Sequence, residues 1–191
     1  MATTMDEPVN RRDFIHIAAT AFAAVGGAVA LWPLIDQMNP DATALSLASI
    51  EVDLAPIQAG QAITVMWRGK PVFVRNRTPE EVQKAKDTPL GSLKDPVARI
   101  MGETAPKTAD DANLTKAGHE NWLVAVGICT HLGCIPKGQK VGDDRGEFGG
   151  WFCPCHGSAY DTAGRIRKGP APNNLEIPPY AFVSDTKIKI G

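Results

Sequence analysis

The sequence predicts an all-β head domain, built as a β-sandwich with one short helix, that follows an N-terminal transmembrane helix. Three observations lead to this prediction. Residues 14–35 contain no Asp, Glu, Lys or Arg, short apolar runs separated by turn residues recur from residue 50 to 191, and all four cysteines lie in two short loops between such runs. The part from residue 50 onward is long enough for one small domain with its own core.

The N-terminal run Phe14–Ile35 is long enough to cross a membrane. Its 22 residues span about 33 Å as a helix, close to the roughly 30 Å of a hydrocarbon core. We expect residues 14–37 to form an uncleaved anchor. A cleaved signal peptide is the competing interpretation, but Pro33–Gln37 lacks a small-x-small cleavage site.

The residues before this run resemble a twin-arginine export signal, which serves proteins that are exported already folded. They read Asn10-Arg11-Arg12-Asp13-Phe14-Ile15. Arg11 and Arg12 also satisfy the positive-inside rule. We therefore expect residues 1–13 to be cytoplasmic and the C-terminal head to lie outside the cytoplasm, in the periplasm of a bacterium.

The head contains several strand-like runs and one helix with a clear start. Ile63–Trp67 and Val72–Val74 flank a turn and predict a hairpin. Further strands are expected at Trp122–Val126, Gly150–Phe152, Tyr180–Val183 and Lys187–Ile190. Thr78-Pro79-Glu80-Glu81 forms a capping box with Pro at the first helical position, and the helix should end before Pro89. The stretch 88–119 is interpreted as a loop in which His119 is solvent-exposed.

Two cysteine–histidine loops are the strongest functional signal. They read Cys129-Thr130-His131-Leu132-Gly133-Cys134 and Cys153-Pro154-Cys155-His156-Gly157-Ser158. Each offers one Cys–His pair and one spare cysteine, which suits a mixed-ligand metal site plus one disulfide. A Cys₂His₂ zinc site and two plain disulfides are the alternatives. Zinc sites usually pair like with like, and a pure disulfide framework leaves both histidines unexplained.

This pattern resembles the Rieske iron–sulfur protein. The resemblance implies one 2Fe–2S cluster held by Cys129 and Cys153 on one iron and by His131 and His156 on the other. It implies a Cys134–Cys155 disulfide between the two loops, and hence an oxidising compartment. It also implies a Rieske-type antiparallel β-sandwich with an inserted cluster-binding subdomain at about 127–172, within a head of residues 50–191.

The same resemblance assigns roles to residues around the cluster. Ser158 would donate to a bridging sulfide and Tyr160 to the sulfur of Cys129, which would raise the reduction potential to a value suited to ubiquinol. Leu132 would cover the cluster tip and contact the quinone pocket. The loop Gly169-Pro170-Ala171-Pro172 would cover the cluster from the opposite side. The basic run Arg165, Arg167 and Lys168 is expected to be a solvated strand face, with the steering of acidic partners as the alternative.

The whole chain resembles the Rieske subunit of a bacterial quinol–cytochrome c oxidoreductase. The resemblance implies that the head takes an electron from ubiquinol at the outer site of the cytochrome b subunit, with His156 as the quinol partner and His131 beside it. The head would then deliver the electron to a c-type cytochrome subunit. Residues 38–49 would be a flexible hinge, with a static tether as the alternative. Membrane lipid would surround the anchor, and the complex would be dimeric.

Other classes remain as alternatives. The Rieske small subunit of a periplasmic oxidoreductase such as arsenite oxidase would share the export signal and the disulfide, whereas an oxygenase Rieske domain would lack Cys134 and Cys155. A zinc-stabilised binding module would be colourless. A net charge of −1 gives no reason to expect nucleic-acid binding.

Overall fold

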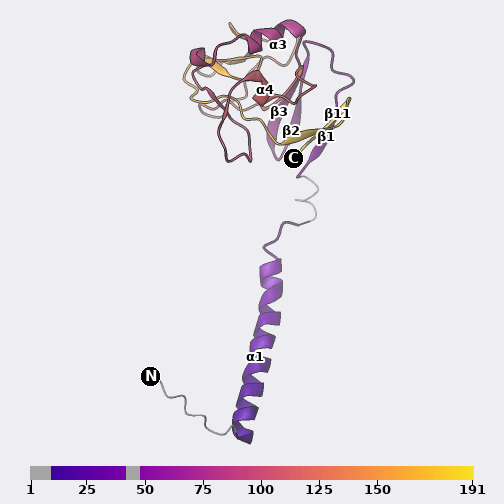
Figure 1. Cartoon of the computed structure of the whole chain (residues 1–191), viewed down its shortest axis with the longest axis vertical. Coiled ribbons are helices and arrows are strands. Elements are labelled where there is room, and N and C mark those ends of the chain that lie inside the picture. The colour runs from indigo at the N-terminus through magenta and orange to yellow at the C-terminus, as the bar shows by residue number, and fades with distance from the viewer. Residues whose placement is uncertain (1–9, 42–47) are drawn as a thin grey trace. The chain divides into compact units, whose positions relative to one another are not determined.

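The computed structural model describes residues 10–41 and 48–191, in two units that divide between Leu45 and Ser46 (Figure 1). Residues 1–9 of the expected cytoplasmic segment and residues 42–47 of the expected hinge lie outside the described residues. The predicted fold class is confirmed: the second unit consists mainly of antiparallel strands, and the described part of the first unit contains one long helix.

The described part of the first unit contains helix α1 (Arg11–Asp36), whose 26 residues correspond to about 39 Å. Asn10 caps it, because its side chain accepts from the backbone N–H groups of Arg12 and Asp13 while the Asp13 carboxylate accepts from Asn10 N–H. Its most apolar 18-residue window has a mean hydropathy of 1.9. Length and composition therefore suit a membrane span, although a signal sequence would satisfy the same test.

Residues 48–191 form three three-stranded sheets and one two-stranded sheet, and the strands in each of these sheets pair antiparallel. The first sheet has the order β1 (Ile50–Asp53), β11 (Lys187–Ile190), β10 (Tyr180–Ser184). The second has the order β2 (Ala62–Trp67), β3 (Lys70–Asn76), β6 (Trp122–Val126). The third has the order β7 (Gly149–Cys153), β8 (Ser158–Asp161), β9 (Ile166–Lys168), and β4 (Val97–Ala98) pairs with β5 (Lys107–Thr108). Thus β1 and β11, from opposite ends of the head, lie side by side (Figure 1).

The predicted hairpin is confirmed, with a two-residue turn. β2 and β3 pair from Ala62 opposite Arg75 to Trp67 opposite Lys70. Arg68 and Gly69, between the strands, have φ angles of 49° and 73°. Two successive left-handed residues match the right-handed twist of the strands, as in a type I′ turn.

The predicted helix is also confirmed. Helix α3 (Pro79–Lys86) begins with the Thr78–Glu81 capping box and has its C-cap at Asp87, before Pro89. The stretch 88–119, by contrast, is not a plain loop. It contains the 3₁₀ turn η1 (Leu90–Ser92), strands β4 and β5 and the short helix α4 (Asp111–Leu114).

Two expectations about individual side chains were wrong. His119 is half-buried rather than solvent-exposed, because its ring stacks on Phe182 with centroids 3.7 Å apart. Arg165 is buried, and its guanidinium bonds the Asp161 carboxylate at 2.8 Å and the carbonyl oxygens of Ala85 and Ala109. The basic run 165–168 is therefore not a uniformly solvated strand face.

The β2–β3–β6 sheet packs against β7, the strand that leads into the second cysteine loop. The Phe73 ring on β3 stacks on Trp151 of β7 at 5.7 Å and 10°. A Cβ added to Gly127, directly after β6, would lie 2.3 Å from the Phe73 ring. The first cysteine loop therefore leaves β6 at a point where only glycine fits. The β7–β8–β9 sheet and both cysteine loops lie between β6 and β10 in the chain.

Candidate metal centre

The two cysteine loops share one backbone geometry. The carbonyl of Cys129 accepts the N–H of Gly133, and the carbonyl of Cys153 accepts the N–H of Gly157, both at 3.0 Å. Both glycines are left-handed, with φ angles of 83° and 76°, a conformation that costs glycine little. Each loop therefore turns back over its first cysteine.

The first cysteine of each loop is a free, buried thiol. Cys129 and Cys153 each have 2% of their surface exposed. Burial raises the pKa of Cys153, and a hydrogen bond between the two thiols adds to the shift. Thiols bind a metal as thiolates, so two buried free cysteines from neighbouring loops suit a metal that displaces their protons.

The two histidines, one from each cysteine loop, contact each other. The rings of His131 and His156 lie edge to face, with centroids 4.7 Å apart and an angle of 88°. The Nδ1 atom of His131 is buried without a hydrogen-bond partner in the structure. A buried nitrogen without a partner is costly, so this atom is available as a metal ligand.

The other two cysteines form a disulfide between the loops, as the resemblance implied. Cys134 bonds Cys155 across a sequence separation of 21, with Cα atoms 6.8 Å apart. The sulfurs of Cys134, Cys153 and Cys155 lie within 4.8 Å of one another. Only Cys153 of these three has a free thiol, so these three sulfurs do not form a three-thiolate metal site.

Two polar side chains on β8 lie beside the buried thiols. The hydroxyl of Tyr160 donates to Cys129 Sγ at 3.3 Å and accepts the Thr130 N–H at 3.3 Å. Tyr160 has no exposed surface, and its burial and the hydrogen bond with Cys129 raise its pKa. Ser158, which is 1% exposed, accepts the N–H of Ala171 at 3.2 Å. The structure thus contains the Tyr160–Cys129 contact that the resemblance implied.

The proline-containing loop lies directly against β8. A Cβ added to Gly169 would lie 2.5 Å from Ser158 Cα and 2.7 Å from the Gly157 oxygen, and Gly169 has a φ of 98°. Ala171 is fully buried, whereas Pro170 is exposed. Asn173, just past this loop, accepts at its carbonyl the Thr130 hydroxyl at 2.6 Å. The loop therefore contacts both cysteine loops.

The tip of this site is exposed and partly apolar. Leu132 has 71% and Ile135 58% of its surface exposed, and His156 is also exposed. The first loop and the residue after it thus expose two large aliphatic side chains, and the second loop exposes an imidazole. Groups of these two kinds suit a ligand with an apolar body and a polar hydroxyl.

Sequence reasoning missed several residues that shape this site. Ile135, directly after the first cysteine loop, is exposed. Thr130 could have been identified from the sequence, because it lies between the expected ligands Cys129 and His131. Asn174 is buried, and its Oδ1 accepts the N–H of Ile166 while its Nδ2 donates to Asp95 and Val97 carbonyls. No local pattern marks this asparagine, because its Asp95 and Val97 partners lie 79 and 77 residues away.

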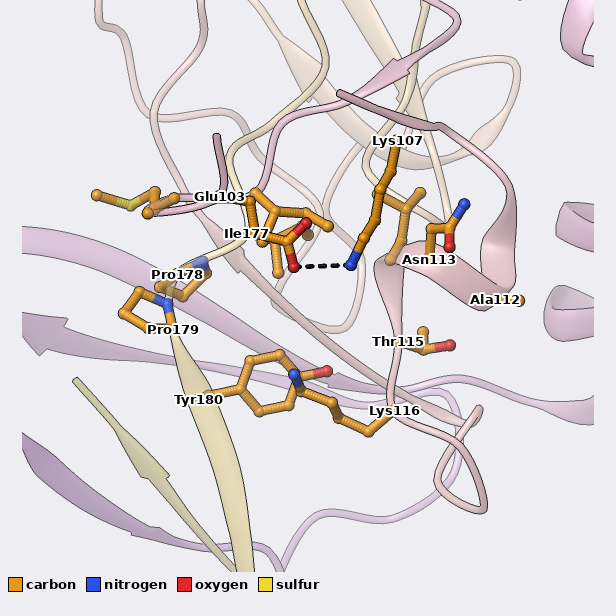
Figure 2. A pocket seen from close by; sticks show the side chains of 14 residues that line it. Glu103, Lys107, Ala112, Asn113, Thr115, Lys116, Ile177, Pro178, Pro179 and Tyr180 are labelled. Atoms are coloured by element: carbon orange, nitrogen blue, oxygen red, sulfur yellow. Dashed lines mark hydrogen bonds and ion pairs between the residues drawn. The ribbon is translucent and has the colours of Figure 1, made fainter. Parts of the chain in front are cut away.

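A cavity of about 470 Å³ lies elsewhere in the head (Figure 2). Its lining comes from residues 100–116 and 177–180, so the cysteine loops do not contribute to it. Glu103 and Lys107 form an ion pair at 2.8 Å, which lies across the cavity from Tyr180 (Figure 2). The Lys116 ammonium lies 5.0 Å from the centre of the Tyr180 ring. Burial raises the pKa of Tyr180, whose hydroxyl has no hydrogen-bond partner in the structure. This cavity is separate from the metal centre.

The residues present fit a 2Fe–2S cluster with mixed ligands. Two buried thiols, a buried imidazole nitrogen without a partner and a second imidazole come from two loops that a disulfide joins. Two sulfur and two nitrogen donors are the ligand set of Rieske-type centres.

Comparisons with known proteins agree with this donor set. The family model described as "Rieske [2Fe-2S] domain" matches residues 78–180. The model described as "Ubiquitinol-cytochrome C reductase Fe-S subunit TAT signal" matches residues 1–41.

Similar proteins cover the full length of the chain. The ubiquinol-cytochrome c reductase iron-sulfur subunit of Rhodospirillum rubrum is 56% identical over 190 residues, covering 100% of this chain and 96% of the relative. The protein of the same name from Bradyrhizobium diazoefficiens is 53% identical over 191 residues, covering 100% and 98%. A solved structure titled "Hyperthermophilic respiratory Complex III" has a TM-score of 0.56 and 29% identity, covering 91% of this chain and 98% of that chain.

Proposed function

This chain belongs to the family of Rieske iron–sulfur subunits of ubiquinol–cytochrome c reductase, and on that premise we propose the path of its electrons. The head takes electrons one at a time from ubiquinol at the outer quinol site of the cytochrome b subunit. It passes each electron to the c-type cytochrome subunit. The full-length similarity to reductase subunits favours this role over that of an arsenite oxidase small subunit.

Four residues would hold the cofactor: Cys129 and Cys153 on one iron, and His131 and His156 on the other. When bound, a 2Fe–2S cluster with this ligand set supplies a one-electron acceptor with a potential of roughly −150 to +300 mV. Its neutral oxidised charge makes it a better acceptor than a four-thiolate cluster. The buried positions of both cysteines keep water away from the sulfur ligands.

His156 is our candidate for the residue that binds the quinol. Its side chain is exposed, whereas His131 is half-buried with its Nδ1 enclosed. An exposed imidazole can form a hydrogen bond with a quinol hydroxyl and hold the proton that the hydroxyl releases. Leu132, 71% exposed, would contact the apolar ring of the quinol. The pair of imidazoles 4.7 Å apart at an exposed apolar tip is the observation that supports the proposal most.

The export signal and the apolar helix support a membrane-anchored subunit with an exported head. We infer that α1 remains as the anchor in membrane lipid, with a cytoplasmic N-terminus and a periplasmic head, in a dimeric complex. A hinge at residues 38–49 would let the head move between its electron donor and its electron acceptor. Edman sequencing of the mature protein tests retention of the anchor, because cleavage would give a new N-terminus near residue 40.

The central test is an EPR spectrum of reduced membranes that contain the chain, with and without an inhibitor of the outer quinol site. We expect a Rieske-type signal whose g-values change when the inhibitor binds. Leu132→Ala should keep the signal, weaken its response to the inhibitor and slow quinol oxidation. An inhibitor that blocks quinol oxidation without changing the signal would contradict docking at this site. Zinc in the purified protein, without iron or acid-labile sulfide, would contradict the electron-carrier role.

A further inference from the structure

A lysine far from the cysteine loops in sequence binds the proline-containing loop. The Lys94 ammonium donates to the carbonyl of Gly169 at 2.6 Å and to the carbonyl of Ala171 at 2.9 Å. These two carbonyls flank Pro170. Lys94 therefore contacts the loop directly on either side of its first proline.

The loop needs a donor from outside because it has few donors of its own. Pro170 and Pro172 carry no N–H group, so they cannot anchor the loop by backbone donation. Carbonyl oxygens are its main points of attachment, and they require a donor. An ammonium group with three donors on a flexible stem can bind two carbonyls at once.

The inner side of the same segment contacts the metal centre. Ala171 N–H donates to Ser158 Oγ at 3.2 Å, and Gly169 packs against the Ser158 backbone. Ser158 therefore uses a lone pair to accept from Ala171 and keeps its own hydroxyl proton for another acceptor. A hydroxyl that accepts one hydrogen bond becomes a stronger donor in a second one.

The residue that follows Lys94 holds the far end of the loop. The Asp95 carboxylate accepts the N–H of Asn174 at 2.9 Å, and the Asp95 carbonyl accepts the Asn174 side-chain amide at 2.9 Å. Two consecutive residues thus fix segment 169–174 at both ends. Asp95 is buried, whereas Lys94 is exposed, so Lys94 can be replaced without opening the core.

We propose that Lys94 is a positioning residue for the 2Fe–2S centre. By binding the Gly169 and Ala171 carbonyls, it keeps the Ala171 N–H on Ser158 and so sets the strength of the hydrogen bond that Ser158 donates toward the cluster. Lys94 thereby helps to set the reduction potential. The proposal rests on the cluster assignment and does not depend on where quinol docks.

The test compares Lys94→Met and Lys94→Arg with Lys107→Met in the cluster-loaded full-length protein. Lys107 is a matched control because it is also exposed and also loses one charge, but it pairs with Glu103 instead of the loop. Two quantities are measured: the midpoint potential by redox titration at low and high salt, and the hydrogen-exchange rate of the Ala171 amide. Neither measurement requires quinol turnover.

We expect Lys94→Met to lower the midpoint potential at both salt concentrations and to speed exchange at Ala171 by at least tenfold. Lys94→Arg should recover part of both effects, and Lys107→Met should change neither. Unchanged exchange at Ala171 in Lys94→Met would overturn the proposal, and so would a potential shift that vanishes at high salt, since that is a long-range charge effect. If the unsubstituted protein holds no 2Fe–2S cluster, the proposed function fails and the exchange measurement still tests the Lys94 contact.

Discussion

Tyr160 donates its hydroxyl to Cys129 Sγ at 3.3 Å while its oxygen accepts the backbone N–H of Thr130, which is the residue next to Cys129. The phenol thus binds both the sulfur and the peptide that positions it. Because Tyr160 has no exposed surface, water does not compete for this hydrogen bond. A buried donor on a sulfur ligand stabilises the extra negative charge of a reduced cluster.

We therefore expect Tyr160→Phe to lower the midpoint potential. A hydrogen bond that strengthens by about 1 kcal/mol on reduction corresponds to about 40 mV, since a tenfold change in a one-electron equilibrium is about 59 mV. Ser158→Ala should also lower it, because it removes the hydroxyl donor. Redox titration followed by EPR measures both. Tyr180→Phe is the control, because Tyr180 is also buried but lines the separate cavity. Equal potentials in Tyr160→Phe and the unsubstituted protein would contradict this role.

The Cys134–Cys155 disulfide should stabilise the head and retain the cluster. It closes a loop with a sequence separation of 21, which the chain-entropy model values at about 3 kcal/mol. We expect the Cys134→Ser/Cys155→Ser double variant to unfold on the order of 10 °C lower in calorimetry. It should also release iron to a chelator several times faster. Replacing both cysteines leaves neither disulfide partner as an unpaired thiol. An unchanged rate of iron release would therefore mean that the disulfide does not hold the loops closed.

Local signals in the sequence predicted local structure well. The Thr78–Glu81 capping box, the Arg68–Gly69 hairpin turn and the charge-free run 14–35 each depend on residues close together in the chain, and each produced the expected element. The two cysteine–histidine loops are local patterns too, and the assignment of their residues as cluster ligands stays a prediction. The structure brings His131 and His156 together and joins Cys134 to Cys155.

Features that depend on distant partners could not be predicted in the same way. Arg165 belongs to a basic run that suggests a solvated face, but carbonyls of Ala85 and Ala109 and the Asp161 carboxylate surround it. His119 is half-buried because Phe182, from another part of the chain, stacks on it. Lys94 offers no motif at all. In each case the partner is set by tertiary packing, which no short pattern encodes.

Gly169 should tolerate no side chain, because the proline-containing loop touches the β8 backbone there. A Cβ would lie 2.5 Å from Ser158 Cα. Gly102 is a matched control: its φ of 84° is also left-handed, but a Cβ there would meet no atom within 4 Å. Gly102→Ala should cost only the backbone strain of about 1–2 kcal/mol. Gly169→Ala should destabilise the head more in denaturant unfolding and lower cluster occupancy, and equal losses in the two variants would show that the contact is unimportant.

The buried Arg165–Asp161 ion pair should be costly to break from one side. Arg165→Met leaves the Asp161 carboxylate buried, with Arg167 3.6 Å away as a remaining cation. Removing one partner of a buried pair typically costs about 3–5 kcal/mol. Arg167→Met, which retains the closer Arg165 contact at 2.8 Å, should cost much less. Urea unfolding of both variants measures the difference, and similar losses would show that Arg167 can replace Arg165.

Asp95 should make the stability of the head depend on pH in the acidic range. Burial raises the pKa of Asp95, but hydrogen bonds from Arg99 and from the N–H groups of Asn174 and Val97 outweigh it, so the net pKa is lowered. The folded pKa thus lies below the unfolded value of about 3.9. The stabilisation is therefore fully present above that value and is lost as the pH falls through the folded pKa.

We expect Asp95→Asn to be less stable than the unsubstituted protein at pH 7, with a difference in unfolding free energy that shrinks below about pH 4. Iron release is followed in both proteins alongside unfolding, so that a difference in cluster loss is separated from a difference in stability. A difference that stays constant from pH 7 to pH 3 would show that Asp95 does not act through its charge.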